Sequence, residues 1–503
     1  MSLRLVTEET PGRGLVAVAL TVAAGGDDDP PGRHGMAHLV EHLMFPRGDG
    51  ATTEGDTGFV ALVQEAGGMC NAETHRDHTV LHTVVPADAL PDVLALEARR
   101  LLRFRPEPAT VRSETAVIAE EIRAAGAGAR LWDTVLAALH PGARHAYGTT
   151  AELTGVTAEE AESFFRAHYR PERAVLSVVG DVDAGRVATL VEREFGAWAP
   201  GLPTAVPPAM LPAAASGRLV PPSLTPAAPG GLVPLTAPAS GTPAWLTPTA
   251  TAPASGTPTA TAPASGTPAS LTAAAPGRPA LLTAPVSGSL VPLTTPGTRH
   301  STALHNSSGH LGSSPRSTLG APIPYARDGV AVGHALADPR GDFRLYVAQV
   351  VLCELLRRSR LPHLVATAPE VDAATVQCGY QGQWLASAAP DLALVLLGRV
   401  PGAGTEEAVG RWLEALGELA ATPPGETELR RAARVLRAGC HRQSDSLPAR
   451  AVTHARAALL LPHATPDALP AHLAAVTPAD VSTGARALLA APRTVHPLEG
   501  AAA

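Results

Sequence analysis

The chain has 503 residues, 45% of them hydrophobic and 17% charged, which is enough for two or more domains with cores of their own. A net charge of −7 leaves no electrostatic case for a nucleic-acid partner. Four scattered cysteines without a Cys-x-x-Cys pair argue against a disulfide framework and a thiolate metal site, so we expect a reducing, cytoplasmic location.

The first 200 residues predict an α+β domain. Their first apolar run, residues 14–24, is far shorter than the roughly 18–20 residues of a membrane span, and we expect neither a span nor an export signal. Strand-like apolar runs then alternate with amphipathic helical patterns. The strand-like runs are 15–23, 79–85 and 174–179, and the helical ones are 87–104, 113–125 and 158–168.

The stretch "GMAHLVEHLMF" places His38, Glu41 and His42 in an apolar run. A helix advances about 100° per residue, so the three side chains share one side. Two imidazoles one turn apart can bind Zn²⁺, and a glutamate between them can take a proton from metal-bound water, the inverzincin arrangement. The alternative is a pair of core histidines that bond to backbone carbonyls, and a third ligand would decide between the two.

The helical stretch 113–125 offers that ligand. Glu114 and Glu121 lie on one stripe with Val117 and Ile118, whereas Glu120 points elsewhere. Carboxylates on an apolar face need a partner, and a metal site would supply one. The alternative is a partly solvated helix with ordinary surface acids.

Residues 201–327 have a different composition. The segment "TAPASGTP" occurs at 236–243, 251–258 and 261–268, and proline is dense throughout. Such a chain cannot propagate helices or sheet ladders, which predicts a long disordered linker. Recruitment of a proline-recognising partner is the alternative.

From 328 to 497 the globular pattern returns, with helical patterns at 342–356 and 412–419 and a strand at 392–400. This layout loosely repeats that of residues 1–200 without a second His-x-x-Glu-His. We therefore expect a catalytic half (1–200), a repeat linker (201–327) and a second half (328–497).

Four stretches carry a family resemblance: "PPGRHGMAHLVEHLMF", "ETAVIAEEI", "HPGARHAYGTTAEL" and "FFRAHYRPERAVLSVVGDVD". With them the first 200 residues resemble the M16 (pitrilysin/insulinase) metallopeptidases, in particular the subfamily of mitochondrial processing peptidase and its bacterial relatives. The resemblance implies one Zn²⁺ per chain held by His38, His42 and Glu121, with Glu41 as base and Glu114 as supporting carboxylate. Glu120, one residue nearer to His42, is the fallback ligand.

The resemblance also implies an architecture of two homologous α+β halves. Each would be a mainly antiparallel sheet with helices packed on one face, and together they would form a clamshell around a peptide. Residues 328–497 resemble a degenerate second half. Residues 69–74 resemble the edge strand to which a substrate adds, with Asn71 and Ala72 as contacts, although an ordinary hairpin strand is equally consistent.

One departure concerns the scissile carbonyl. The family often supplies an arginine and a tyrosine, seven residues apart, from a C-terminal half. Here no arginine lies seven residues before Tyr346 or Tyr380, and no tyrosine follows Tyr380. We therefore expect a homodimer, or a heterodimer with a homologous subunit that supplies the pair.

The sequence thus predicts a zinc-dependent endopeptidase that hydrolyses short or unstructured polypeptides, leader or signal peptides included. The competing hypothesis is a non-catalytic peptide-binding or assembly subunit of a heteromeric M16-type complex. The intact metal-binding motif argues against that hypothesis.

Overall fold

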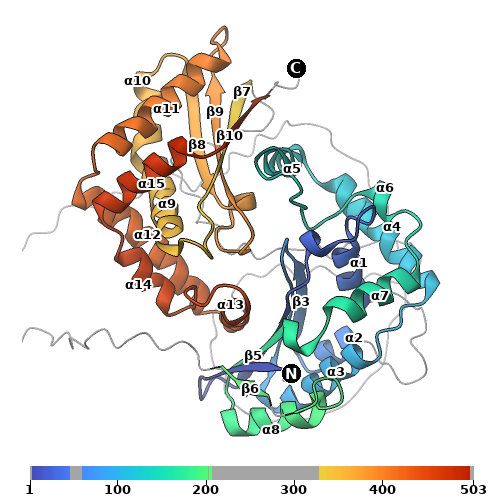
Figure 1. Cartoon of the computed structure of the whole chain (residues 1–503). Helices are drawn as coiled ribbons and strands as arrows, with labels where there is room; N and C mark the ends of the chain where they lie inside the picture. The colour runs from blue at the N-terminus through green and yellow to red at the C-terminus, as the bar shows by residue number, and fades with distance from the viewer. Residues whose placement is uncertain (1–2, 46–58, 202, 207–327, 499–503) are drawn as a thin grey trace, which may run out of the picture. The chain divides into compact units, whose positions relative to one another are not determined.

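The computed structural model describes residues 3–45, 59–201, 203–206 and 328–498. The predicted linker lies almost entirely outside the described residues, so its expected disorder remains a prediction. The described residues form two β-sheets with helices, which confirms the α+β class (Figure 1). None of the described helices has the length and hydropathy that crossing a membrane requires.

The first sheet has six strands in the order β3-β4-β2-β5-β1-β6. It is mainly antiparallel, and only β1 pairs in parallel, with β5 and β6. The strands are β1 (Arg4–Glu9), β2 (Leu15–Val22), β3 (Met69–Thr74), β4 (Thr79–Pro86), β5 (Ala174–Gly180) and β6 (Thr204–Ala205).

The second sheet is antiparallel throughout, in the order β10-β7-β9-β8. Its strands are β7 (Gly329–Ala335), β8 (Val371–Cys378), β9 (Leu392–Arg399) and β10 (Arg493–Leu498). The order β3-β4-β2-β5 of the first sheet recurs here as β8-β9-β7-β10, and an α-helix follows β7 as one follows β2. The repeated layout that the sequence predicts is therefore present in the strand topology.

The helices fall into two sets along the chain. The first set is α1 (Met36–Met44), α2 (Phe59–Glu65), α3 (Leu90–Leu102), α4 (Pro108–Ala124), α5 (Ala127–Leu139), α6 (Thr150–Leu153), α7 (Ala158–His168) and α8 (Ala184–Phe195). The second set is α9 (Phe343–Leu355), α10 (Leu361–Thr367), α11 (Thr405–Ala421), α12 (Glu426–Ser444), α13 (Leu447–Leu459), α14 (Ala468–Ala474) and α15 (Pro478–Ala490). Short 3-10 helices occupy Gly26–Asp28, Ala87–Ala89, Pro171–Arg173 and Tyr380–Gly382, and a π-helix, Leu356–Arg360, lies between α9 and α10.

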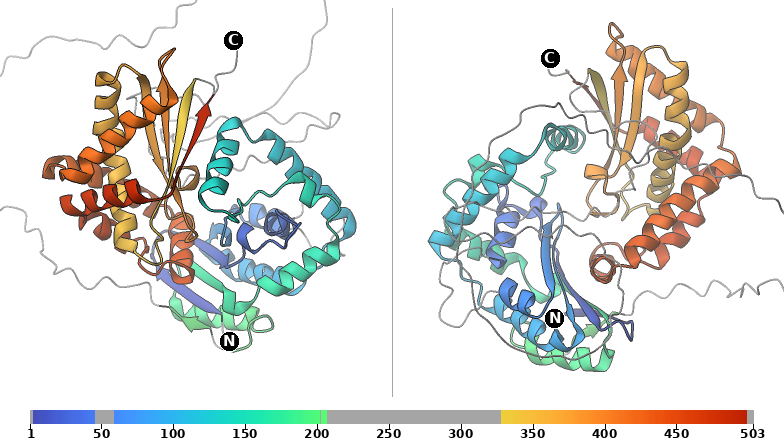
Figure 2. Two further views of the ribbon diagram at one scale, coloured as in Figure 1. Left: turned by 45° about the horizontal axis from the view of Figure 1, so that its top comes forward. Right: turned by 180° about the vertical axis from the view of Figure 1, so that it is seen from behind.

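Both faces of each sheet are apolar. Along β2, Val16, Val18 and Leu20 pack with α1, α3, α7 and α8, while Ala17 and Ala19 face the other way. Side chains alternate between the faces of a strand, so a run that is apolar at every position needs cover on both sides. In the second sheet α9, α11 and α15 cover one face, and both views of Figure 2 show these yellow-to-red helices along it.

The remaining face of each sheet is covered by a helix from the other half of the chain. Leu447, Ala451 and Ala455 of α13 pack on β2 and β5 of the first sheet. Conversely, Trp132 and Val135 of α5 pack on β7 and β9 of the second. Each half thus packs its own helices on one face of its sheet, as expected, and the second apolar face is covered by a helix of the other half, which was not expected.

The predicted elements of both halves are otherwise confirmed at nearly the expected bounds. The strand-like runs 15–23, 79–85 and 174–179 form β2, β4 and β5, and the strand expected at 392–400 is β9. The helical stretch 412–419 is the middle of the longer α11. The sequence analysis did not identify α5 and α13, the two helices that the halves exchange.

Substitution at Gly333 in β7 tests the packing of α5 on the second sheet. A Cβ there would lie 2.3 Å from Val135 Cγ1 on α5, so we expect Gly333→Ala to lower the free energy of unfolding by about 1–3 kcal/mol. Gly410 in α11 has no atom within 4 Å of such a Cβ, so Gly410→Ala is the control and should be neutral or stabilising. Denaturant unfolding measures both, and equal stability of the two variants would contradict the contact.

Candidate metal centre and active site

Helix α1 carries the predicted motif and is buried along its whole length. Its first turn is held by Asp29, whose carboxylate accepts the backbone N–H groups of Gly35 at 2.6 Å and Ala37 at 2.8 Å. Burial raises the pKa of Asp29 to about 7, although these two bonds act in the opposite direction. A polar anchor thus fixes the start of a helix that would otherwise be positioned by apolar packing alone.

His38 and His42 direct their Nε2 atoms toward one another, 3.2 Å apart. The Nδ1 atom of His42 lies 3.0 Å from the Glu114 carboxylate, and that of His38 lies 3.4 Å from the Tyr147 carbonyl oxygen. Both Nδ1 atoms face acceptors and therefore carry hydrogen, which leaves the two Nε2 lone pairs pointing at each other.

Helix α4 brings Glu121 to the same point. Its Oε2 lies 3.7 Å from His38 Nε2 and 3.6 Å from His42 Nε2. Glu120 instead pairs with Arg123 on the exposed side of α4, where its side chain is 67% exposed. Of the two candidate third ligands, the structure therefore brings Glu121 to the histidines, as the helical stripe predicts.

The three side chains fit a zinc ion. Within the described part of the chain, His38, His42 and Glu121 form the one group of potential ligands whose donor atoms all lie within 4.8 Å of one another. Two imidazole nitrogens bound to one tetrahedral Zn²⁺ are roughly 3.3 Å apart, close to the separation found here. Two lone pairs at this distance repel unless a cation or proton lies between them, and nitrogen with carboxylate oxygen is a donor set that Zn²⁺ prefers.

Burial and the nearby carboxylates move the pKa values of the two histidines apart. Burial lowers the pKa of His38 to about 3, helped by the neighbouring His42. Burial also acts to lower the pKa of His42, but its contacts with Glu114 and Glu121 outweigh this and raise the pKa to about 9. The carboxylates of α4 thus make this site favourable for positive charge.

Glu41 lies beside this group and faces the edge strand. Its Oε2 accepts a hydrogen bond from Thr74 Oγ1 at 2.5 Å, and burial raises its pKa. Strand β3 ends the sheet, so in the described residues its outer edge has no strand partner. Asn71 lines the pocket next to Glu41, whereas the side chain of Ala72 is buried in the core. Sequence reasoning had missed Thr74.

A pocket opens in front of these residues, with walls from both halves of the chain. One wall holds His38, Glu41, Asn71 and Tyr147. The other is the turn and loop from Tyr380 to Asp391, anchored where Asp77 Oδ2 accepts the Ala388 N–H at 2.7 Å. Arg76 also donates to the Pro390 carbonyl, and Tyr380 donates its hydroxyl to Asp133. No motif in the sequence predicts this second wall.

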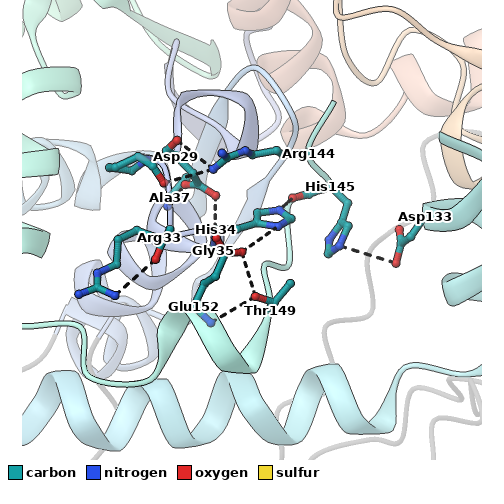
Figure 3. A network of polar contacts seen from close by, with 12 residues as sticks. Asp29, Arg33, His34, Gly35, Ala37, Asp133, Arg144, His145, Thr149 and Glu152 are labelled. Carbon is teal, nitrogen blue, oxygen red and sulfur yellow. Dashed lines mark hydrogen bonds and ion pairs between the residues drawn. The ribbon is translucent and has the colours of Figure 1, made fainter. Parts of the chain in front are cut away.

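The loop that carries Tyr147 is bonded to the segment before α1 (Figure 3). The backbone N–H of Arg144 donates to Asp27, and its guanidinium donates to the Asp29 carbonyl. His34 Nε2 lies 2.7 Å from the carbonyl oxygen of His145. These bonds hold the loop against the helix that bears His38, and Figure 3 shows both segments converging on the start of α1.

Two models of one protein family match the N-terminal part of the sequence. A model of the insulinase family (peptidase family M16) matches residues 4–153, and a model of the M16 inactive domain matches residues 155–228. Residues 4–228 of this chain thus belong to the M16 family. The chain is 33% identical over 199 residues to an uncharacterised zinc protease of Mycobacterium leprae, and the alignment covers 39% of this chain and 44% of the relative.

More distant relatives and a solved structure are also similar to this chain. A probable mitochondrial-processing peptidase subunit beta of Schizosaccharomyces pombe is 26% identical over 199 residues, covering 39% of this chain and 43% of the relative. The chain thus spans less than half the length of the curated relatives it matches. A solved protease from Helicobacter pylori shares the fold, with a TM-score of 0.61, 16% identity and 98% coverage of both chains.

A matched pair of substitutions tests the third ligand. We expect Glu121→Gln to weaken zinc binding by at least about tenfold, an effect already seen when groups that only orient the ligands are lost. Glu120→Gln removes an equal charge one residue away and should leave the affinity unchanged. Competition with a chelator measures both, and an equal loss in the two variants would contradict the assignment.

Proposed function

We propose that this protein is a zinc-dependent endopeptidase that hydrolyses short or unstructured polypeptides, leader or signal peptides among them. The observation that carries the proposal is the convergence of His38, His42 and Glu121 with the buried Glu41, in a pocket beside an edge strand. The relative in M. leprae is named a zinc protease, which agrees with this reading.

His38, His42 and Glu121 would hold one Zn²⁺ per chain, and what the ion supplies is a water whose pKa falls to about 7. Glu114 contacts Nδ1 of His42, which makes it a positioning residue that keeps Nε2 directed at the metal. Glu41 would accept the proton of the attacking water and return it to the leaving amine. Its raised pKa suits a group that must both take up and release a proton near neutral pH.

The peptide would bind as an additional strand on the free edge of β3. Main-chain groups of Asn71 and Ala72 would provide the hydrogen bonds, so the burial of the Ala72 side chain is compatible with this role. An extended substrate is required for such pairing, which favours short or unstructured polypeptides over folded proteins. Residues 1–200 would form the catalytic half and residues 328–497 a homologous second half, and the two would close around the peptide.

The alternative is a non-catalytic peptide-binding or assembly subunit of an M16-type complex. Such a subunit needs the edge strand and the pocket but neither Glu41 nor a complete ligand set. Retention of all four groups in one buried cluster favours catalysis. A homodimer, or a heterodimer with a homologous subunit, belongs to the same proposal, since the chain lacks the arginine–tyrosine pair.

Removal of the base tests the mechanism. We expect Glu41→Gln to lower the rate of peptide hydrolysis by about 10²–10⁴-fold while zinc stays near one per chain. Mass spectrometry of a peptide library incubated with the full chain supplies the substrate and the rates, and Glu120→Gln is the control. Full activity of Glu41→Gln on every cleaved peptide would refute the proposal, and so would a wild-type chain that holds zinc and cleaves nothing, alone or with a homologous subunit.

A further inference from the structure

Tyr147 lines the pocket and carries a hydroxyl that can donate a hydrogen bond. Its ring packs edge-on against the imidazole of His38, with centroids 5.6 Å apart, and the residue is 38% exposed. Within the described residues its hydroxyl makes no hydrogen bond. Among the pocket-lining residues on the wall of the metal ligands, it is the one phenol.

The backbone around Tyr147 is held on both sides. Before it, His145 and Arg144 bond to the segment that precedes α1 (Figure 3). After it, Gly148 lies so close to Gly35 that a Cβ on Gly148 would be 2.3 Å from the Gly35 Cα. Two bonded segments and a glycine–glycine contact thus fix the ring next to the ligand helix, as a preorganised donor requires.

Two neighbouring side chains of the pocket already donate to other groups. Tyr380 donates its hydroxyl to Asp133, and Arg76 uses both terminal nitrogens, for the Pro390 carbonyl and Asp27. A phenol has an ordinary pKa of about 10, so the Tyr147 hydroxyl carries its proton at neutral pH.

We propose that Tyr147 is a catalytic residue whose hydroxyl donates a hydrogen bond to the carbonyl oxygen of the scissile peptide bond. The inference rests on the proposed peptidase function and deepens it. It assigns to Tyr147 the polarisation of the scissile carbonyl, for which the sequence contains no arginine–tyrosine pair. Tyr147 would then take the role that a pair from a partner subunit would otherwise have.

The step balances without ionisation of the tyrosine. The water oxygen forms a bond to the carbonyl carbon, its proton passes to Glu41, and the carbonyl π pair moves onto the oxygen that Tyr147 bonds. When the C–N bond breaks, that pair returns to the carbon–oxygen bond and Glu41 gives its proton to the amine. Tyr147 contributes because its bond strengthens as negative charge develops on the oxygen.

Tyr147→Phe tests the assignment on the full chain. We expect kcat to fall by about 10²-fold, the effect of one lost oxyanion donor, with KM within about threefold and zinc content unchanged. Binding of a phosphinic analogue of the cleaved peptide, measured by calorimetry, should weaken at least about tenfold. Binding of the uncleaved peptide in a Glu41→Gln background should be unaffected, because its carbonyl carries no developing charge.

Tyr169→Phe is the control, because this phenol directly follows α7, is buried in the apolar core and does not line the pocket. A kcat of Tyr147→Phe within about threefold of the wild type would overturn the inference, as would a change in KM alone or a loss of zinc. If the wild type cleaves peptides and Glu41→Gln does not, the proposed function stands even when the Tyr147 assignment fails. If the wild type cleaves none, both proposals fall.

Discussion

Each sheet has a second apolar face that must be buried, and the rest of the structure depends on how this is achieved. β2 and β9 are apolar at successive positions, so neither sheet can leave a face in water without exposing a continuous hydrophobic surface. Each half takes its missing cover from the other, α13 for the first sheet and α5 for the second. Because α5 also carries Asp133, this exchange brings the Tyr380 turn to the wall of the pocket.

Within the first half, a second constraint builds the site. Three titratable side chains lie on a wholly buried helix. Because burial removes water, each needs a hydrogen-bond or charge partner within the protein. Glu114, Glu121 and Thr74 provide these partners from α4 and β3, while Asp29 holds the start of the helix. Burying these titratable groups costs free energy and would be unfavourable in an ordinary core. Such exceptions to the burial of apolar residues are expected at functional sites.

The parts of this site that the sequence predicts share one property: each is fixed by the period of a single helix. His38, Glu41 and His42 lie on one face of α1, and the seven-residue spacing of Glu114 and Glu121 places both toward it. Thr74 and Tyr147 could not be found in this way, because they come from a strand end and a loop whose positions depend on tertiary contacts. The same holds for α13, whose alanine-rich face has no strong periodic signal but fits closely on a flat sheet.

The helix exchange also bears on how such a sequence can change over time. Ala17 and Ala19 of β2 meet Ala451 and Ala455 of α13, small side chains on both sides of one interface. A larger residue on either side would need a smaller one opposite, although the two lie in different halves of the chain. Substitutions at these positions should therefore be correlated among related proteins, and the two halves should evolve as a single unit even where the segment that joins them varies freely in length.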